Sequence, residues 1–279
     1  MKKILGKEIR KDLEEKLSKR IARLPIVPVF CDLVVGNDPA SLQYVSMKER
    51  YAERLGIRTV SAILPSSATT QDVLNTITTL SQKEGMSGLI VQLPLPAHID
   101  RERVLDSIPE DIDVDCLGKK QRDLFYAGKS PLIYPTARAV MYLLEPHLDQ
   151  SVPILVIGTG PLVGAPVTYL LRAKGYQVTA ISKHEKDLKH YTQTHTTVIS
   201  AAGIPGLIHT DMLSENTVII DAGTSESDGS IVGDVDLTSL SHRPSYIAPV
   251  PGGVGPLTVY YLMENVVSVA ERRYSTTDI

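Results

Sequence analysis

Short apolar runs alternate with amphipathic segments along this chain, and the alternation occurs twice. The first series is VPVFCDLVVG, a helical pattern over 39–55, RTVSAILP, a second helical pattern, and GLIVQLPLP. From Pro153 a second series runs ILVIG, a helical pattern from Leu162 to Lys174, QVTAI, TTVIS and NTVIIDAG. Apolar runs of this length indicate buried strands, and the periodicity between them indicates helices. We therefore predict an α/β fold with parallel sheets, whose ligands bind at the carboxyl ends of the strands.

A polar stretch over 109–128 separates the two series, and we place the domain junction near residue 137. The last helical pattern, from Gly255 to Arg273, carries an apolar stripe that can pack back onto the first domain. A chain of 279 residues is long enough for two modest domains. We expect a βαβ domain at 1–137, completed by the C-terminal helix at 254–279, and a Rossmann-like domain at 138–253.

Charge and cysteine content narrow the function classes. Lys and Arg number 29 against 32 Asp and Glu, a net charge of −3, so nucleic acid and anionic membranes are not expected partners. Cys31 and Cys116 lie far apart, outside zinc-type spacings, which favours a reduced, cytoplasmic protein. No apolar run approaches the ~18 residues of a membrane span, and the opening segment lacks the apolar core of a signal peptide. The seven histidines do not form a helical metal pair, so we expect no metal.

A glycine-rich turn, GTGPLVG at 158–164, directly follows an apolar strand and opens a helix. In that context a turn of this kind brings backbone close to a pyrophosphate, and the helix N-terminus faces the anion. The spacing alone is a weak signal because glycines also end strands for steric reasons, but the strand and helix around it strengthen the interpretation. The candidate cofactor-binding residues are Gly158, Thr159, Gly160, Val163, Gly164, Ser182, Lys183, Ala202, Gly203 and Thr224.

The end of the next predicted strand bears on the type of cofactor. NAD sites commonly have a carboxylate here for the ribose 2′-hydroxyl, whereas this chain has Ser182, Lys183 and His184. A hydroxyl, an ammonium and an imidazole suit a 2′-phosphate, which favours NADP. Glu185 lies close enough to keep NAD as an alternative.

Tyr44 and Lys48 are four residues apart in the helical pattern over 39–55, so their side chains project from one face of that helix. They can share a site, although the spacing alone is more typical of an ordinary surface pair. Neighbouring motifs favour the site. These are SxxYVxxK at 41–48, VQLPLP at 91–96, DVD at 113–115, the turn at 158–166, GDVD at 233–236 and PVPGGVGPLT at 249–258.

In this order and over essentially the whole chain, the motifs resemble the bifunctional methylenetetrahydrofolate dehydrogenase/cyclohydrolase family. The resemblance implies a homodimeric two-domain enzyme whose first, catalytic domain holds folate and whose second domain holds NAD(P). It implies oxidation of 5,10-methylenetetrahydrofolate by hydride transfer to NADP, then hydrolysis of the methenyl product to 10-formyltetrahydrofolate. Lys48 would be the catalytic lysine, Tyr44 a group that packs on the ring, Gln92 the partner of the lysine and Asp115 the pterin ligand. The implied substrate-binding residues are Tyr44, Lys48, Val91, Gln92, Leu93, Asp115, Pro251, Gly252, Gly253 and Gly255.

The chemistry of hydrolysis suits these residue types. Water must add to a cationic carbon and lose a proton, so we expect Lys48 to be partly neutral, buried, and bonded to an uncharged partner, Gln92. Asp115 offers two acceptor oxygens to adjacent N–H donors of a pterin, and Asp113 in the same acidic loop is its rival. The glycines after Pro251 indicate close approach of backbone to a ligand, or a hinge between domains.

Some positions depart from the family pattern. Thr159 and Gly160 stand where an Arg-Ser pair is common, so one phosphate-binding side chain is missing, and Cys116 stands where a glycine usually follows the last Asp of DVD. Because of these departures, a cyclohydrolase with weakened dehydrogenase activity remains an alternative function. Two further functions are compatible with the sequence: an NADP-dependent dehydrogenase of another small substrate, with Lys48 as general base, and a catalytically silent binding protein.

Overall fold

The computed structural model describes residues 1–227, 230–240 and 244–274, and it divides into two compact units. The lysine unit comprises Asp12–Ile133 and Leu262–Ile279, and the glycine-turn unit comprises Met1–Lys11 and Tyr134–Tyr261. Each unit contains a parallel sheet, so the α/β fold class predicted from the sequence is confirmed. The predicted junction near 137 lies close to the observed bound at Ile133, whereas residues 1–11 and 254–261, which the sequence analysis gave to the first domain, belong to the glycine-turn unit. The final predicted segment, 275–279, lies outside the described residues.

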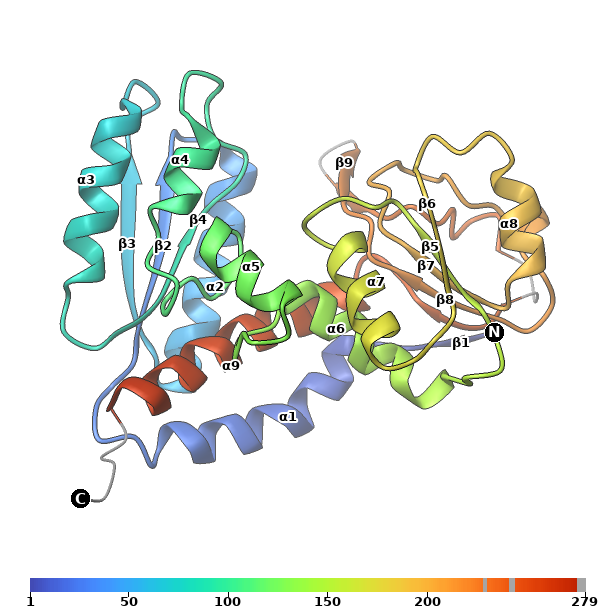
Figure 1. Cartoon of the computed structure of the whole chain (residues 1–279), viewed down its shortest axis with the longest axis horizontal. Coiled ribbons are helices and arrows are strands. Elements are labelled where there is room, and N and C mark those ends of the chain that lie inside the picture. The colour runs from blue at the N-terminus through green and yellow to red at the C-terminus, as the bar shows by residue number, and fades with distance from the viewer. Residues whose placement is uncertain (228–229, 241–243, 275–279) are drawn as a thin grey trace. The chain divides into compact units, whose positions relative to one another are not determined.

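The lysine unit is built on a three-stranded sheet of order β3-β2-β4, in which both pairings are parallel. Its strands are β2 (Val29–Val35), β3 (Arg58–Leu64) and β4 (Met86–Val91), which Figure 1 shows running together. Helix α2 (Pro39–Leu55) contacts β2 and β3, and α3 (Thr70–Ser81) contacts β4. Strand β2 lies in the middle of the sheet and is buried along its whole length, as a central parallel strand requires.

Helix α2 begins and ends where its sequence provides caps. The Asp38 side chain accepts a hydrogen bond from the Ser41 amide, Pro39 occupies the first turn, and Gly56 ends the helix at φ 91°. Between these caps the residues that face the core recur at helical spacing, and Val45 and Lys48 both lie on this buried face.

The last helix, α9 (Val254–Tyr274), contributes its second half to the lysine unit. A Cβ placed on Gly88 of β4 would lie 2.6 Å from a methyl of Val266, so the glycine permits close approach of the helix to the sheet. The Asn265 side chain donates hydrogen bonds of 2.8 Å to the carbonyls of Val114 and Ile133. The loop that carries DVD is therefore fastened to α9.

The glycine-turn unit holds a six-stranded sheet of order β1-β11-β8-β7-β5-β6, parallel throughout. The strands are β1 (Lys2–Lys3), β5 (Ile154–Ile157), β6 (Val178–Ile181), β7 (Thr197–Ser200), β8 (Thr217–Asp221) and β11 (Pro244–Ala248). Helices α6 (Pro135–Leu144) and α7 (Gly164–Ala173) pack against each other, α6 contacts β8, and α7 contacts β5 and β6. A short antiparallel pair, β9 (Ser225–Ser227) and β10 (Ser230–Val232), follows β8.

Several short elements escape the sequence patterns. They are β1, β9, β10, β11, α4 (Arg101–Asp106), α5 (Lys119–Tyr126) and α8 (Leu188–Thr194). The opening helix α1 (Gly6–Ile21), by contrast, follows the helical spacing of Leu and Ile residues in the sequence. Helix α5 lies inside the 109–128 stretch that lacks periodicity, because eight residues are too few to display a helical period. Within the described ranges, no helix is long and apolar enough to cross a membrane.

Candidate functional site

The Lys48 side chain is buried at the centre of a polar cluster in the lysine unit. Its Nζ lies 2.8 Å from Oε1 of Gln92, 2.5 Å from Oδ2 of Asp32 and 4.7 Å from the centroid of the Tyr44 ring. Helix α2 supplies Tyr44 and Lys48, β4 is followed directly by Gln92, and β2 supplies Asp32. The structure thus brings together three residues that the sequence predicted, and adds a fourth.

Gln92 is held in one orientation. Its backbone amide donates to the Leu33 carbonyl at 2.8 Å, and its side-chain amide nitrogen donates to the Leu93 carbonyl at 2.8 Å. With the nitrogen engaged, Oε1 is the atom that faces Lys48. This is the end of the amide that accepts a hydrogen bond from an amine in either protonation state.

Asp32 is the residue that the sequence analysis missed. It is 1% exposed, and burial raises its pKa to about 6 in spite of the opposing charge and hydrogen bond of Lys48. The expected bond between Lys48 and Gln92 is present, and Asp32 is a second, acidic partner of the amine that the sequence analysis did not foresee. A single acid within an otherwise apolar strand, VFCDLVV, was the signal available, because a charge in such a strand needs a buried partner.

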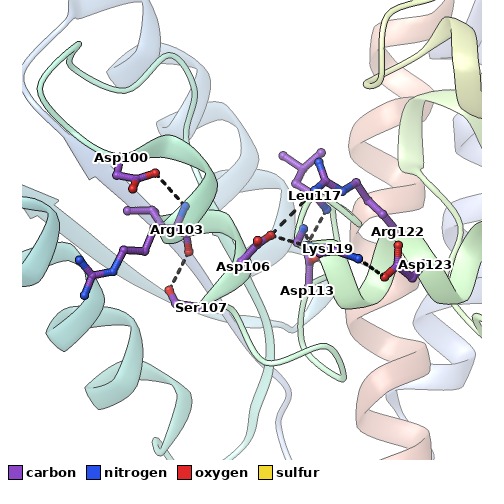
Figure 2. Close-up of polar contacts among 11 residues, drawn as sticks. Asp100, Arg103, Asp106, Ser107, Asp113, Leu117, Lys119, Arg122 and Asp123 are labelled. Atoms are coloured by element: carbon purple, nitrogen blue, oxygen red, sulfur yellow. Dashed lines mark hydrogen bonds and ion pairs between the residues drawn. The ribbon is translucent and has the colours of Figure 1, made fainter.

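Asp113 and Asp115 have different surroundings, although only one residue separates them. The Asp113 carboxylate is buried and accepts hydrogen bonds from the backbone amides of Gly118 at 2.7 Å and Leu117 at 3.2 Å. Figure 2 shows this carboxylate directed at the backbone that precedes α5. Burial nevertheless raises the pKa of Asp113 to about 7. Both oxygens of Asp113 are engaged in organising its own loop.

Asp115 is only partly buried, and it interacts electrostatically with Lys48. Burial raises its pKa, while the positive charge of Lys48 acts in the opposite direction. The next residue, Cys116, has a φ of 61°, a left-handed conformation that favours glycine. This backbone requirement accounts for the glycine expected at that position. Of the two acids, Asp115 is the one whose carboxylate has no backbone amide bound to it among the hydrogen bonds of the described loop.

The glycine turn lines a cavity of about 300 Å³ in the glycine-turn unit. The cavity walls contain Gly158, Thr159, Gly160, Ser182, Lys183, His184, Ala201 and Ala202. Six of these belong to the predicted cofactor set, His184 was named beside Ser182 and Lys183 for a 2′-phosphate, and Ala201, directly after β7, is an addition. Val163 and Gly164 lie outside the lining, at the start of α7, and Gly203 and Thr224 lie outside it in the loops after β7 and β8.

The glycines of the turn have separate steric roles. A Cβ on Gly164 would lie 1.8 Å from the Gly158 carbonyl oxygen, and one on Gly158, whose φ is 87°, would lie 2.4 Å from the Ala201 carbonyl oxygen. A Cβ on Gly160 would have nothing within 4 Å. The first and last glycines are therefore needed for the turn and the helix to pack, whereas the middle glycine leaves open space beside the backbone.

Two buried acids support the wall of this cavity. Asp234 accepts hydrogen bonds from the Ser200 hydroxyl at 2.6 Å and from the amides of Ala202 at 2.7 Å and Ile204 at 2.8 Å. Asp221 accepts from the amides of Gly223, Asp234 and Val235 at 3.0 to 3.1 Å. The GDVD motif thus holds the loop after β7 in place.

The predicted substrate residues Pro251, Gly252, Gly253 and Gly255 belong to the glycine-turn unit, whereas Val91 and Leu93 belong to the lysine unit. Val91 is buried at the end of β4, and Leu93 is partly buried. Gly252 has a φ of 103°, and a Cβ on Gly6 would lie 2.0 Å from the Gly253 carbonyl oxygen. The contact explains why residue 6 is a glycine, and a Cβ on Gly253 would itself lie 2.7 Å from the Pro249 carbonyl oxygen, so packing within the loop accounts for that glycine.

The described residues contain no group of three or more His, Cys, Asp or Glu side chains placed to hold a metal ion. The sequence-based expectation of no metal stays a prediction. The lysine unit offers a buried amine with a carboxylate and an amide beside it, and the glycine-turn unit offers a cavity lined by a glycine-rich turn that directly follows a parallel strand. These features define a two-domain α/β protein of the dinucleotide-binding class.

Comparison with known proteins narrows this class to one family. Residues 4–115 match the family described as "Tetrahydrofolate dehydrogenase/cyclohydrolase, catalytic domain", and residues 134–274 match its "NAD(P)-binding domain". The "Bifunctional protein FolD" of Lactobacillus delbrueckii is 35% identical over 96% of this chain and 97% of that protein. The protein of the same name from Aquifex aeolicus is 34% identical over 98% of this chain and 95% of its own length.

Solved structures of similar proteins support the same family assignment. The bifunctional methylenetetrahydrofolate dehydrogenase/cyclohydrolase FolD of Campylobacter jejuni superposes with a TM-score of 0.91 at 34% identity, covering 98% of this chain and 99% of that chain. The Trypanosoma brucei dehydrogenase-cyclohydrolase, solved with NADP and an inhibitor, has a TM-score of 0.89 at 31% identity, covering 96% and 97%. This chain belongs to the tetrahydrofolate dehydrogenase/cyclohydrolase family, and the family resemblance predicted from the sequence is confirmed.

Proposed function

We propose that this protein oxidises 5,10-methylenetetrahydrofolate with NADP and hydrolyses the methenyl product to 10-formyltetrahydrofolate. The observation that carries the proposal is the buried Lys48 amine, which lies 2.8 Å from Gln92 Oε1 and faces the Tyr44 ring. Full-length relatives that are named as bifunctional enzymes support it. The folate-binding domain is proposed to comprise 1–137 and 254–279, and the dinucleotide-binding domain 138–253.

We assign the hydrolytic step to Lys48. Water adds to the cationic methenyl carbon and must lose a proton, which the Lys48 amine accepts. Gln92 holds this amine through Oε1. The Tyr44 side chain is 37% exposed, so part of its ring surface is free to pack against the substrate. Asp115 takes the pterin N–H donors, because Asp113 is already bonded to its own loop.

The cavity at the glycine turn fits a dinucleotide phosphate. Backbone is open beside Gly160, and Gly158 and Gly164 allow the packing that creates this opening. When bound there, NADP supplies the acceptor for the hydride. Ser182, Lys183 and His184 line the cavity and offer donors to a 2′-phosphate, and the cavity lining includes no carboxylate. Thr159 and Gly160 offer no cation, so we expect a modest preference for NADP over NAD.

The test of this proposal is turnover by the purified protein and by Lys48→Met. The parent should reduce NADP with methylenetetrahydrofolate faster than it reduces NAD, and should hydrolyse methenyltetrahydrofolate above the buffer rate. In Lys48→Met the hydrolysis should fall to that buffer rate, because Met fills the stem space without an amine, while NADP binding persists. Parent-like hydrolysis by Lys48→Met would refute the assignment of Lys48. Hydrolysis without NADP or NAD reduction by the parent would point instead to a cyclohydrolase with weakened dehydrogenase activity.

We also propose a homodimer in the cytoplasm. The dimer rests on the family resemblance, and sedimentation at micromolar protein concentration tests it. The cytoplasmic location rests on the two cysteines, Cys31 and Cys116, which are free and buried.

A further inference from the structure

Asp32 is the one charged residue of β2, a strand whose other members are all apolar and buried. An ion pair removed from water gains little net stability, since desolvation of both charges offsets their attraction. Well-packed apolar residues of similar volume commonly stabilise a core as well or better. The Asp32–Lys48 pair is therefore poorly explained as a device for stability.

The contacts of Asp32 also differ from those of the other buried acids. Asp113 accepts two backbone hydrogen bonds and Asp221 accepts three, so each organises a loop. Asp32 accepts none from backbone in the described part of the chain, and its one close polar contact there is Lys48 Nζ, at 2.5 Å from Oδ2. Its carboxylate has no fold-organising contact, and it faces the amine that the proposed function places in catalysis.

We propose that Asp32 is a positioning residue that holds the catalytic proton of Lys48, so that the two side chains work as one pair carrying a single shared proton. This inference rests on the proposed function of Lys48. With the proton on Asp32, the amine of Lys48 is neutral and free to act as a base. With the proton on Lys48, the carboxylate balances the ammonium beside a cationic substrate.

The protons of the hydrolysis reaction balance when the Asp32–Lys48 pair acts as the base. Water oxygen bonds to the methenyl carbon, one water proton passes to the Lys48 amine, and the C–N π electrons return to nitrogen, which leaves a neutral adduct. The ring then opens as the C–N5 bond breaks with its electron pair on N5. N5 takes the proton back from Lys48, and the adduct hydroxyl releases its proton to solvent as the formyl C=O forms. One proton leaves per turnover, and the pair returns to its starting state.

Several titratable groups act on Asp32. Lys48, Tyr44 and Glu49 lie on α2, Asp115 lies on the loop after Asp113, and Gln92, which is uncharged, follows β4. Asp115 and Glu49 favour the protonated form of Asp32, and Lys48 opposes it. Because the pKa of Asp32 is about 6, a second proton enters the pair below that pH. The parent should therefore lose hydrolytic kcat as the pH falls through about 6.

The decisive variant is Asp32→Asn, assayed for hydrolysis of methenyltetrahydrofolate from pH 5 to 9 after subtraction of the uncatalysed rate. We expect kcat to fall on the order of 10²-fold with little change in KM. We also expect the acidic limb of the pH–rate profile, which is the loss of kcat below about pH 6 in the parent, to move by more than one pH unit. Asp32→Glu, which keeps an acid, should recover part of kcat and retain the limb. Asp32→Ser, which leaves space for water beside the amine, carries the same test if the Asn variant does not fold.

Glu49→Gln is the matched control, since it removes a neighbouring carboxylate without touching Lys48. Its kcat should stay within about twofold of the parent, because the charge of Glu49 is screened by solvent. Removal of this charge should shift the pH at which kcat falls but should not abolish the fall. Parent-like kcat and limb in Asp32→Asn, alongside an inactive Lys48→Met, would overturn the inference and leave the proposed function standing. Parent-like activity in Lys48→Met would instead remove the proposed function itself.

Discussion

At the residue scale, substitution of the two acids of the DVD motif should have different effects on folate binding and on stability. Asp115→Asn should weaken folate binding by about 1.5 to 3 kcal/mol, because an amide offers one acceptor and two donors where two acceptors are needed. The thermal stability of this variant should change little, since Asp115 is partly exposed. Titration calorimetry with a folate ligand, together with a melting curve, measures both effects.

Asp113→Asn is the comparison variant for this prediction. Its side chain would lose one of the two backbone hydrogen bonds to Leu117 and Gly118, so we expect a stability loss of about 1 to 2 kcal/mol and a smaller effect on folate. A larger loss of folate affinity in Asp113→Asn than in Asp115→Asn would reverse the assignment.

Sequence motifs identified Tyr44, Lys48 and Gln92, because a helix face and a strand end are both readable from local patterns. The motifs favoured Asp115 but left Asp113 as its rival, since that choice depends on backbone amides just before α5 that bond to Asp113. Asp32 was missed for a related reason. Its partner is 16 residues away on a different element, and no spacing rule joins a strand residue to the buried face of the following helix.

At the scale of elements, the glycine turn should tolerate substitution unequally. Gly164→Ala would place a Cβ 1.8 Å from the Gly158 carbonyl oxygen, so α7 must shift away from the turn. We expect a loss of stability of about 2 to 4 kcal/mol, at the upper end of single substitutions, together with loss of NADP binding. Thermal melting and fluorescence titration with NADPH measure the two effects.

Gly160→Ala is the matched control within the same turn. Nothing lies within 4 Å of the added Cβ, so the melting temperature should remain close to that of the parent. NADP affinity should still fall, because the methyl occupies the space proposed for the phosphate. Equal destabilisation by both substitutions would contradict the separate roles of the two glycines.

The elements that sequence patterns located are the longer ones. The apolar runs predicted β2, β3, β4, β5, β6, β7 and β8, and the periodic segments predicted α2, α3, α7 and α9 to within a few residues. Strand β1 has two residues, and it exists because β11 offers a parallel edge to pair with. Such an element is defined by its tertiary partner, so local sequence carries no sign of it.

At the scale of the whole molecule, buried acids set how stability depends on pH. Asp221 has a pKa raised to about 7 by burial, which outweighs its hydrogen bonds from Val235 and Asp234. The unfolded chain would release this proton near pH 4. Between these values the folded state therefore binds more protons than the unfolded state, and stability must fall as the pH rises. Asp32 and Asp113, with pKa values of about 6 and 7, act in the same direction.

Asp221→Asn isolates this contribution. At pH 5 the variant should be less stable than the parent by about 1 to 2 kcal/mol, because an amide oxygen cannot accept all three backbone hydrogen bonds that Asp221 receives. As the pH rises to 8, the parent must ionise a buried acid and the variant need not, so the difference in stability between parent and variant should become smaller. Calorimetric scans at both pH values measure it. A gap that widens with pH would mean that the folded protein stabilises the ionised carboxylate of Asp221 through those amides.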